Sequence, residues 1–337
     1  MSTELPLKVA LFGSGRIGQV HARNILANPD LELAVIADPF IEGARALAAG
    51  TGARAVATVD EAFAIADLDA IIIGSPTNTH VDLISRAAAH GVAALCEKPI
   101  DLDIDRVRSC RDGIRDSKSP LMLGFNRRFD PNFASVQARV QAGEIGRLEQ
   151  LTIISRDPAP APASYIANSG GIFRDQSIHD LDMARFFVPE IIEVSATGSN
   201  LFCDYIEEAG DFDSVVINLR GARGEQITII NSRHSAFGHD QRLEAFGSDG
   251  MLSAGNLTPT SVRKYTAAGA EEADPYLHFF LERYAQAYRR ELDSFVQSIR
   301  TGTPCSPGFE DGLQALVLAN AAEESARSGR VVKVGQE

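Results

Sequence analysis

The sequence predicts an α/β fold that begins with a doubly wound parallel sheet. Short, wholly apolar segments alternate with segments of helical pattern through the first third of the chain, and this alternation is typical of parallel strands covered by helices on both faces. A glycine-rich turn follows the first apolar segment. The length of 337 residues exceeds the size at which one hydrophobic core usually stops growing, so we expect two domains.

The predicted elements of the first domain follow one another in a regular order. Apolar runs bounded by glycine, proline or polar residues predict strands at 9–12, 33–37, 70–73, 93–96 and 121–123. Helical patterns lie between the first of these strands, at 17–27 and 42–49. The proline-rich run 158–162 predicts a stiff extended loop.

Composition and charge exclude several classes of function. The formal net charge of -13 argues against a nucleic acid or an anionic membrane as partner. The four cysteines have neither paired nor metal-like spacing, so we expect reduced thiols and no metal site. The first seven residues contain no apolar signal region, and no apolar run approaches membrane-spanning length. These features predict a soluble, cytoplasmic protein.

A dinucleotide-binding fingerprint opens the chain. The motif G-x-G-x-x-G stands at the end of the first predicted strand, as Gly13-Ser14-Gly15-Arg16-Ile17-Gly18. In a Rossmann fold its glycines permit a tight turn, approach of a pyrophosphate and close helix packing. Asp38 ends the second strand, where a carboxylate can bind ribose hydroxyls and disfavours a 2′-phosphate. The motif therefore predicts NAD in preference to NADP; the competing interpretation is a structural turn with Asp38 as a helix cap.

Asp175 and His179 form a candidate acid/base pair. They follow Gly170 and Gly171, and a helix predicted at 176–187 would place them on one face of its first turns. Histidine is a natural proton acceptor because its unperturbed pKa is about 6.5. Asp175 can orient a neighbour or bind a hydroxyl, or it can simply cap the helix, and a structural hydrogen bond is the alternative for His179.

Three polar motifs follow predicted strands, where open parallel sheets bind ligands. They are Ser75-Pro76-Thr77-Asn78-Thr79-His80, Glu97-Lys98-Pro99 and Gly124-Phe125-Asn126-Arg127-Arg128-Phe129-Asp130-Pro131. As a cation, Lys98 can stabilise a developing alkoxide. The alternative for Lys98 is a surface lysine paired with Glu97.

In this order, the motifs resemble the glucose-fructose oxidoreductase/inositol dehydrogenase/rhizopine-catabolism family over nearly the whole chain. Within it the inositol 2-dehydrogenases are the most similar, through the stretches 155–158, 178–186 and 240–247. The resemblance implies a catalytic set of Lys98, Asp175 and His179. It implies that NAD is bound by Gly13, Gly15, Arg16, Ile17, Gly18, Asp38, Ser75, Pro76, Thr77, Asn78, His80, Glu97, Lys98 and Arg127. Substrate contacts are expected from Lys98, Arg128, Asp157, Asp175, His179 and His239, with Asp240 as a further candidate.

The resemblance also implies the architecture of the second part. We expect a Rossmann domain at 1–124 and an α+β domain at 125–337, with an open, mostly antiparallel sheet and helices on one face. Strands at 191–197, 214–219, 225–232, 242–247 and 262–266 and helices at 279–300 and 311–327 are compatible with it. The last helix can pack back on the first domain. The open face of the sheet can be the interface of a homo-oligomer, either a tetramer or a dimer.

The sequence thus predicts NAD-dependent oxidation of a ring secondary alcohol of an inositol. His239 departs from the tyrosine expected at this position and leaves the inositol isomer open. One alternative is an aldose dehydrogenase that oxidises a sugar at C1. Another is an NAD-using glycosidase of the same fold, which would release sugar without net NADH. A nucleotide sensor is disfavoured, because it needs no proton acceptor.

Overall fold

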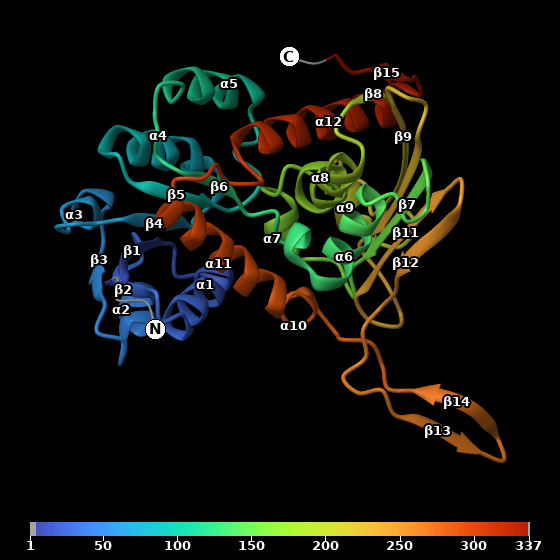
Figure 1. Ribbon diagram of the computed structural model, residues 1–337, viewed down its shortest axis with the longest axis horizontal. Helices are drawn as coiled ribbons and strands as arrows, with labels where there is room; N and C mark the ends of the chain where they lie inside the picture. Colours follow the sequence, from blue (N-terminus) through green and yellow to red (C-terminus); the bar gives the residue numbers. More distant parts are fainter. Residues whose placement is uncertain (1–4, 336–337) are drawn as a thin grey trace. The chain divides into compact units, whose positions relative to one another are not determined.

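The computed structural model describes residues 5–335, which form two units (Figure 1). The first unit runs to Asn126 and takes up Tyr288–Leu313, and the second consists of Arg127–Ala287 and the segment that begins at Gln314. The expected domains, 1–124 and 125–337, stay a prediction.

The first unit is built on a six-stranded parallel sheet with the strand order β3-β2-β1-β4-β5-β6. Its strands are β1 Leu7–Phe12, β2 Leu31–Ala37, β3 Arg54–Val56, β4 Ala70–Ile73, β5 Ala93–Cys96 and β6 Leu121–Leu123. Each predicted strand lies within one of these, and the doubly wound sheet is confirmed. The strand order reverses between β1 and β4, and ligands of such sheets bind at this reversal.

The helices of this unit begin and end at residues with suitable local chemistry. They are α1 Arg16–Ala27, α2 Ile41–Ala48, α3 Val59–Phe63, η1 Thr77–Thr79, α4 His80–His90, α5 Ile104–Gly113 and most of α11 Ala285–Thr301. Thr58 and Glu61 form a capping box at the start of α3. Gly91 ends α4 in the left-handed conformation that glycine adopts without strain.

Helix α11 carries a buried acid, Glu291, which is 0% exposed. Neither of its carboxyl oxygens has a hydrogen-bond partner within residues 5–335. Burial raises the pKa of Glu291 well above its usual range, and the nearby carboxyl of Glu97 adds to this rise. The raised pKa belongs to the folded state. Above the unfolded pKa of about 4.3, folding therefore takes up a proton at Glu291, and the free energy of unfolding falls as the pH rises.

Replacing Glu291 by glutamine should remove this loss, because an amide needs no proton to stay neutral. We expect the free energy of unfolding at neutral pH to rise by on the order of 1 kcal/mol. Urea unfolding between about pH 5 and 8 should show a shallower fall in stability than in the wild type. Glu32→Gln, on the exposed side of β2, is the control. An unchanged pH dependence in E291Q would show that Glu291 is ionised in the folded protein.

The second unit contains a seven-stranded sheet with the order β12-β11-β7-β10-β9-β8-β15. Its strands are β7 Leu148–Arg156, β8 Ile191–Ser199, β9 Ser214–Gly221, β10 Gln226–Ser232, β11 Asp240–Gly247, β12 Gly250–Ala254 and β15 Val332–Lys333. Only β7 and β10 pair in parallel; the other five pairs are antiparallel. The expected mostly antiparallel sheet is therefore confirmed.

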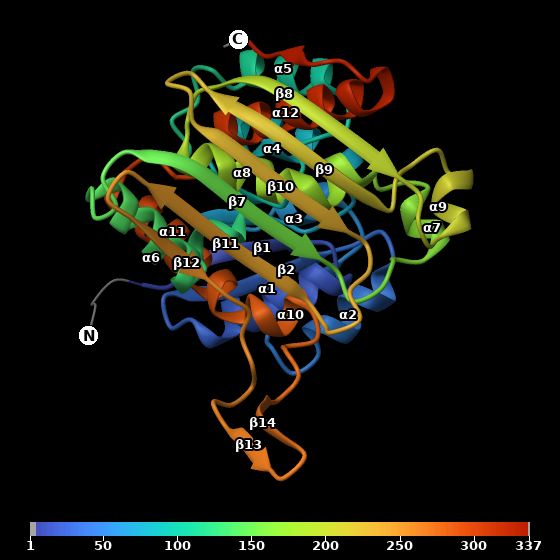
Figure 2. The same cartoon turned by 90° about the vertical axis from the view of Figure 1, so that its right-hand side faces the viewer.

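The helices of the second unit cover one face of this sheet (Figure 2). They are η2 Asn126–Phe129, which begins in the first unit, α6 Pro131–Gln141, α7 Ala163–Ile166, the π-helical turn η3 Phe173–Ser177, α8 Ile178–Phe187, α9 Asp204–Glu208, α10 Phe280–Arg283 and α12 Phe309–Ser328. In β9, β10 and β11 buried residues alternate with more exposed ones, as expected where one sheet face packs on helices. Val216, Phe246 and Met251 remain exposed on strands of this sheet.

One predicted strand of this unit is confirmed but lies outside the large sheet, and one predicted helix is broken in two. The strand expected at 262–266 is β13, Arg263–Thr266, which pairs only with β14, Gly269–Ala273, in a separate ribbon. Its sequence pattern indicates an extended chain but not its partner. The helix expected at 279–300 is broken into α10 and α11 at Tyr284, whose side chain is buried and bonded to Gln241. The central strand β7 was not predicted.

Candidate active site

A backbone cradle lies at the end of β1 in the first unit. Gly13 has φ 98°, and a Cβ there would lie 2.6 Å from the carbonyl oxygen of Gly74. A Cβ on Gly18 would lie 2.1 Å from the carbonyl oxygen of Gly13, so only glycine lets α1 approach β1 this closely. A Cβ on Gly15 would meet nothing within 4 Å in the described chain, which leaves open space beside the turn. These positions match the requirements of a pyrophosphate site.

The N-terminus of α1 supplies the donors for such a site. Its N-cap is Gly15, which has no side chain to bond the first-turn amides, and Arg16 and Ile17 open the helix. Because the first amides of a helix lack carbonyl partners within it, they can bind an anion. The predicted cofactor residues of the fingerprint thus gather at one helix end, and the residues present fit a dinucleotide.

Asp38 is fixed beside this cradle. Its Oδ2 accepts hydrogen bonds from the backbone N–H of Ser14 (2.8 Å) and the Ser14 hydroxyl (2.7 Å), and its Oδ1 accepts from the amide of Phe40 (2.8 Å). Burial raises the pKa of Asp38, but the hydrogen bonds from Ser14 and Phe40 outweigh it, so the pKa is lowered overall. The carboxylate is therefore a charged, oriented acceptor.

Replacing Asp38 by alanine should weaken NAD binding by roughly 10–100-fold, as expected for the loss of hydrogen bonds to a charged group. Binding of NADP should fall less, because the repulsion of its 2′-phosphate is lost as well. Fluorescence titration with both nucleotides measures the two affinities. Asp116→Ala, at an exposed position of the same unit, is the control. Equal NAD affinity in D38A and wild type would refute the ribose assignment.

The residues after β4 form a short bonded turn. The hydroxyls of Ser75 and Thr79 lie 2.6 Å apart, and Thr79 donates to the carbonyl of Pro76. His80 is buried, and its two ring nitrogens lie 2.8 Å from the carbonyl oxygen of Pro99 and 2.9 Å from that of Ser75. His80 therefore ties the end of β4 to the end of β5. The predicted cofactor contacts of Ser75, Pro76, Thr77, Asn78 and His80 stay predictions, and we expect His80 to act through this tie.

Lys98 follows β5 and is half-buried. Glu97, the alternative partner considered for it, bonds the buried His21, with 2.8 Å between Glu97 Oε1 and His21 Nε2. A Cβ on Gly124 would lie 2.9 Å from Glu97 Oε2, so the chain after β6 packs directly on this side chain. Glu97 is thereby held inside the unit, next to Lys98 in the chain.

In the second unit, Asp175 lies inside a π-helical turn, Phe173–Ser177, which continues directly into α8. This corrects the predicted helix start at Gln176 and excludes Asp175 as the helix cap. Its Oδ1 accepts from the hydroxyl of Tyr165 (2.8 Å), and its Oδ2 accepts from Arg233 (2.9 Å). Short π-helical turns are frequent at functional sites.

His179 lies half-buried in the first turn of α8. The next residue, Asp180, is buried and accepts hydrogen bonds from Arg127, Ser155 and Asn231. Burial raises the pKa of Asp180 although the charge of Arg127 opposes it. This network fixes the start of α8 against β7 and β10, and with it the backbone that carries His179.

Two predicted ligand contacts have internal partners. Arg127, expected to bind the cofactor, lies buried in the network of Asp180. Arg128, expected to bind the substrate, forms a buried two-bond ion pair with Asp182, at 2.8 and 2.6 Å. Asp240, a further candidate, is likewise buried and paired with Arg156 and other residues. The ligand contacts expected of these side chains stay predictions.

Asp157 and His239 lie together, with 3.4 Å between Asp157 Oδ1 and His239 Nε2. Burial lowers the pKa of His239, and the hydrogen bond and charge of Asp157 oppose this shift. Gln241 Nε2 lies 3.0 Å from the same His239 nitrogen, and Tyr284 donates to Gln241 Oε1 (2.8 Å). His239 is therefore a neutral, oriented imidazole beside a carboxylate, and its substrate contact remains a prediction.

Tyr165 and Arg233, which both donate to Asp175, were not predicted from the sequence. Tyr165 follows the proline-rich loop in α7, and Arg233 follows the last residue of β10. Local patterns do not reveal such long-range partners. The sequence feature that could have drawn attention to Arg233 is its position directly after an apolar strand.

The two halves of the chain match two family models. One, described as the oxidoreductase family with an NAD-binding Rossmann fold, matches residues 7–125, and the other, the GFO/IDH/MocA C-terminal domain, matches residues 133–253. An inositol 2-dehydrogenase from Rhizobium meliloti is 46% identical over 332 residues, which cover 98% of this chain and 100% of that protein. The chain belongs to the GFO/IDH/MocA family.

Solved structures of this family are similar over their full length. A myo-inositol dehydrogenase from Corynebacterium glutamicum has a TM-score of 0.96 and 64% identity, covering 99% of this chain and 100% of that one. A scyllo-inositol dehydrogenase from Lactobacillus casei, solved with NAD(H) and scyllo-inositol, has a TM-score of 0.91 and 30% identity, covering 97% and 99%.

This GFO/IDH/MocA protein is an NAD-dependent oxidoreductase that acts on a CH–OH group. Within residues 5–335, no group of three or more histidine, cysteine or acidic side chains is placed to hold a metal ion. None of the helices in the described chain has the length and apolar character needed to span a membrane.

Proposed function

We propose that the protein oxidises a ring secondary alcohol of an inositol. The observation that carries this proposal is the half-buried His179 at the start of α8, four residues after Asp175, whose carboxylate accepts hydrogen bonds from Arg233 and Tyr165. Two further observations support it. The first is the Rossmann cradle, and the second is the inositol dehydrogenase activity stated in the names of the similar proteins from R. meliloti and C. glutamicum. When bound, NAD supplies the hydride acceptor.

The side chains of this chain would handle the proton and the developing charge. His179 would accept the hydroxyl proton, as a neutral imidazole does in general base catalysis. Lys98 would bond the substrate oxygen and stabilise its negative charge. Asp175 would accept a hydrogen bond from a ring hydroxyl or orient the base, since its carboxylate is fixed by two donors.

Asp157 and His239 supply the polarity that a polyol requires. A ring with many hydroxyls binds well only where each buried hydroxyl finds a partner. The carboxylate of Asp157 accepts, and the neutral His239 can accept or donate according to its tautomer. We propose that this pair contacts ring hydroxyls that do not react.

A substrate panel tests the proposed function. The purified protein is incubated with NAD and myo-inositol, scyllo-inositol, several aldoses or aryl glycosides, and NADH formation is followed by absorbance. NADH formation with an inositol supports the proposal. Turnover of aldoses alone would establish the aldose dehydrogenase instead, and sugar release without net NADH would establish the glycosidase.

We also propose that the protein forms a homo-oligomer through the open face of its large sheet. Phe246 and Met251 are directly paired on β11 and β12, and both are exposed. Val216 adds an exposed apolar side chain on β9. Exposed apolar side chains of this kind are typical of an interface. Light scattering of the wild type and of F246E/M251E distinguishes an oligomer from a monomer.

A further inference from the structure

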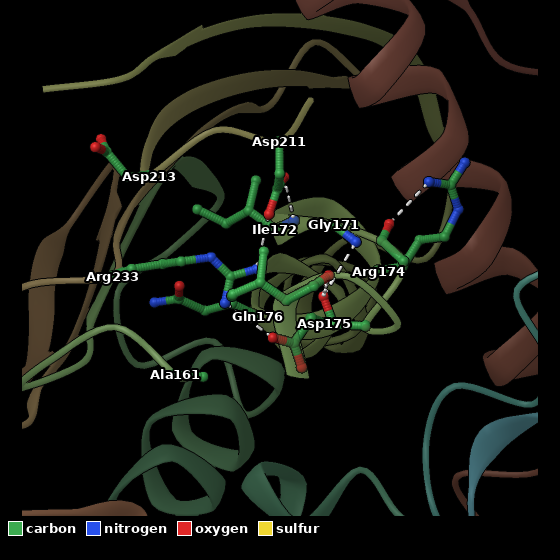
Figure 3. Close-up of polar contacts among 12 residues, drawn as sticks. Ala161, Gly171, Ile172, Arg174, Asp175, Gln176, Asp211, Asp213 and Arg233 are labelled. Atoms are coloured by element: carbon green, nitrogen blue, oxygen red, sulfur yellow. Dashed lines mark hydrogen bonds and ion pairs between the residues drawn. The ribbon is translucent and has the colours of Figure 1, made fainter. Parts of the chain in front are cut away.

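Asp175 is held from two sides by residues far from it in the sequence. Tyr165 donates to one carboxylate oxygen. Arg233 donates to the other (Figure 3). Desolvation of the Tyr165 hydroxyl, followed by the charge of Asp175, raises the pKa of Tyr165, so the phenol stays protonated and donates. Arg233 is only 2% exposed, so its charge must be balanced inside the protein.

A second carboxylate, Asp211, provides the other half of that balance. Arg233 Nη2 donates to Asp211 Oδ2 (3.1 Å), and Asp211 Oδ1 accepts from the backbone N–H of Ile172 (2.8 Å). Figure 3 shows the Arg233 side chain entering between Asp211 and Asp175. Through Asp211, the guanidinium of Arg233 therefore links Ile172, the residue before the π-helical turn, to Asp175 inside that turn.

The backbone at this place needs such a connection. Gly170 and Gly171 both have positive φ, 81° and 82°, and a Cβ on Gly171 would lie 3.0 Å from Asp211 Oδ1. The entry into the turn is thus made of two residues with high intrinsic freedom. Asp211 fixes this entry through Ile172, and Arg233 transmits the constraint to the Asp175 carboxylate. The planar fork of arginine suits two carboxylates at a fixed angle, whereas an ammonium group does not impose that angle.

We propose that Arg233 is a positioning residue for the reaction, and that the bridge Asp211–Arg233–Asp175 sets where the Asp175 carboxylate lies. This inference rests on the proposed function, which places Asp175 among the reacting groups. Arg233 acts through Asp175 and needs no contact with the substrate. Its loss should therefore affect the rate of the chemical step more than the binding of NAD, whose fingerprint belongs to the first unit.

The variants Arg233→Met, Arg233→Lys and Asp175→Asn, and the double variant R233M/D175N, test the proposal. We expect R233M to lower kcat by up to ~10²-fold, as for a misplaced catalytic group, with the KM for NAD within about 2-fold of wild type. R233K should recover part of the loss, because it keeps the charge without the fork. In the D175N background, R233M should change kcat by less than about 2-fold, because residues that act as a unit are not additive.

The matched control is Arg174→Met. Arg174 lies in the same π-helical turn, and Figure 3 shows its side chain turned away from Asp175. Its guanidinium bonds Glu323 and Asn320 on α12 and the carbonyl oxygen of Gly170. R174M should keep the wild-type kcat. Near-normal kcat in R233M, or losses that multiply in R233M/D175N, would overturn the positioning role. The variant R233K, which keeps a cation beside Asp211 and Asp175, guards against misfolding of R233M alone.

Amide hydrogen exchange across residues 171–176 separates this inference from the proposed function. If the wild type oxidises no inositol, the proposed function fails, but the exchange experiment still reports on the bridge. The bridge is supported if the amides of Ile172 and Asp175 exchange about tenfold faster or more in R233M than in wild type, and at the wild-type rate in R174M. Equal exchange in R233M and wild type overturns it, whatever the substrate.

Discussion

Replacing His179 by alanine should lower kcat for inositol oxidation by roughly 10²–10⁴-fold, the usual contribution of a positioned general base. The affinity for NAD should hardly change, because His179 lies in the second unit and the dinucleotide fingerprint lies in the first. The acidic limb of the pH–rate profile should disappear in the variant, since that limb reports protonation of the base. Steady-state kinetics across a pH series and NAD titration measure these quantities.

His90→Ala is a suitable control for this experiment. His90 is an exposed histidine at the end of α4 whose Nδ1 bonds the carbonyl of Arg86. It should leave both kcat and the pH profile unchanged. If H179A keeps a rate close to wild type, another group accepts the proton, and the base assignment is refuted even where the inositol activity itself stands.

Replacing Lys98 by methionine should lower kcat by roughly 10²–10³-fold, as the removal of one donor to a developing oxyanion does. Methionine keeps the length and apolar character of the stem, so the packing of this half-buried side chain changes little. Because the charge develops during the reaction, kcat should fall more than the affinity for substrate. Single-turnover rates and substrate titration separate the two effects.

Lys98→Arg and Lys118→Met complete this series. Arginine keeps the charge but is larger and planar, so only part of the rate should return. Lys118 is exposed after α5, and its loss removes a lysine charge from the same unit without touching the end of β5. A KM effect alone in K98M would assign Lys98 to substrate binding and not to charge stabilisation.

The sheet of the first unit was predictable because its signals are local. Buried parallel strands such as Ala70–Ile73 and Ala93–Cys96 are continuous apolar runs, and their bounds coincide with the prediction. The second unit was harder. In β7, Leu148–Arg156, glutamate, glutamine, threonine, serine and arginine interrupt the apolar residues, and the strand is recognisable only from its position between β10 and β11.

The candidate site shows the same contrast. Gly13, Gly18 and Asp38 follow from a short motif whose mechanics are local. The π-helical turn and the Arg233 bridge depend on Asp211 and Asp175, which are 22 and 58 residues away from Arg233. No window of sequence contains these contacts. The ion pair of Arg128 with Asp182 on α8, 54 residues away, is likewise absent from any local motif, and the substrate contact expected of Arg128 stays a prediction.

The imidazole of His80 has one proton to offer and two carbonyl oxygens to satisfy. Burial lowers the pKa of His80, although the hydrogen bonds to Ser75 and Pro99 favour the charged form. A neutral imidazole carries a single N–H, so at any moment it donates to the carbonyl of Ser75 or to that of Pro99. The turn beside the nucleotide fingerprint and the strand end that bears Lys98 therefore compete for one donor. His80 therefore supplies one hydrogen bond that the two segments share, and its second ring nitrogen faces the other carbonyl oxygen without a proton.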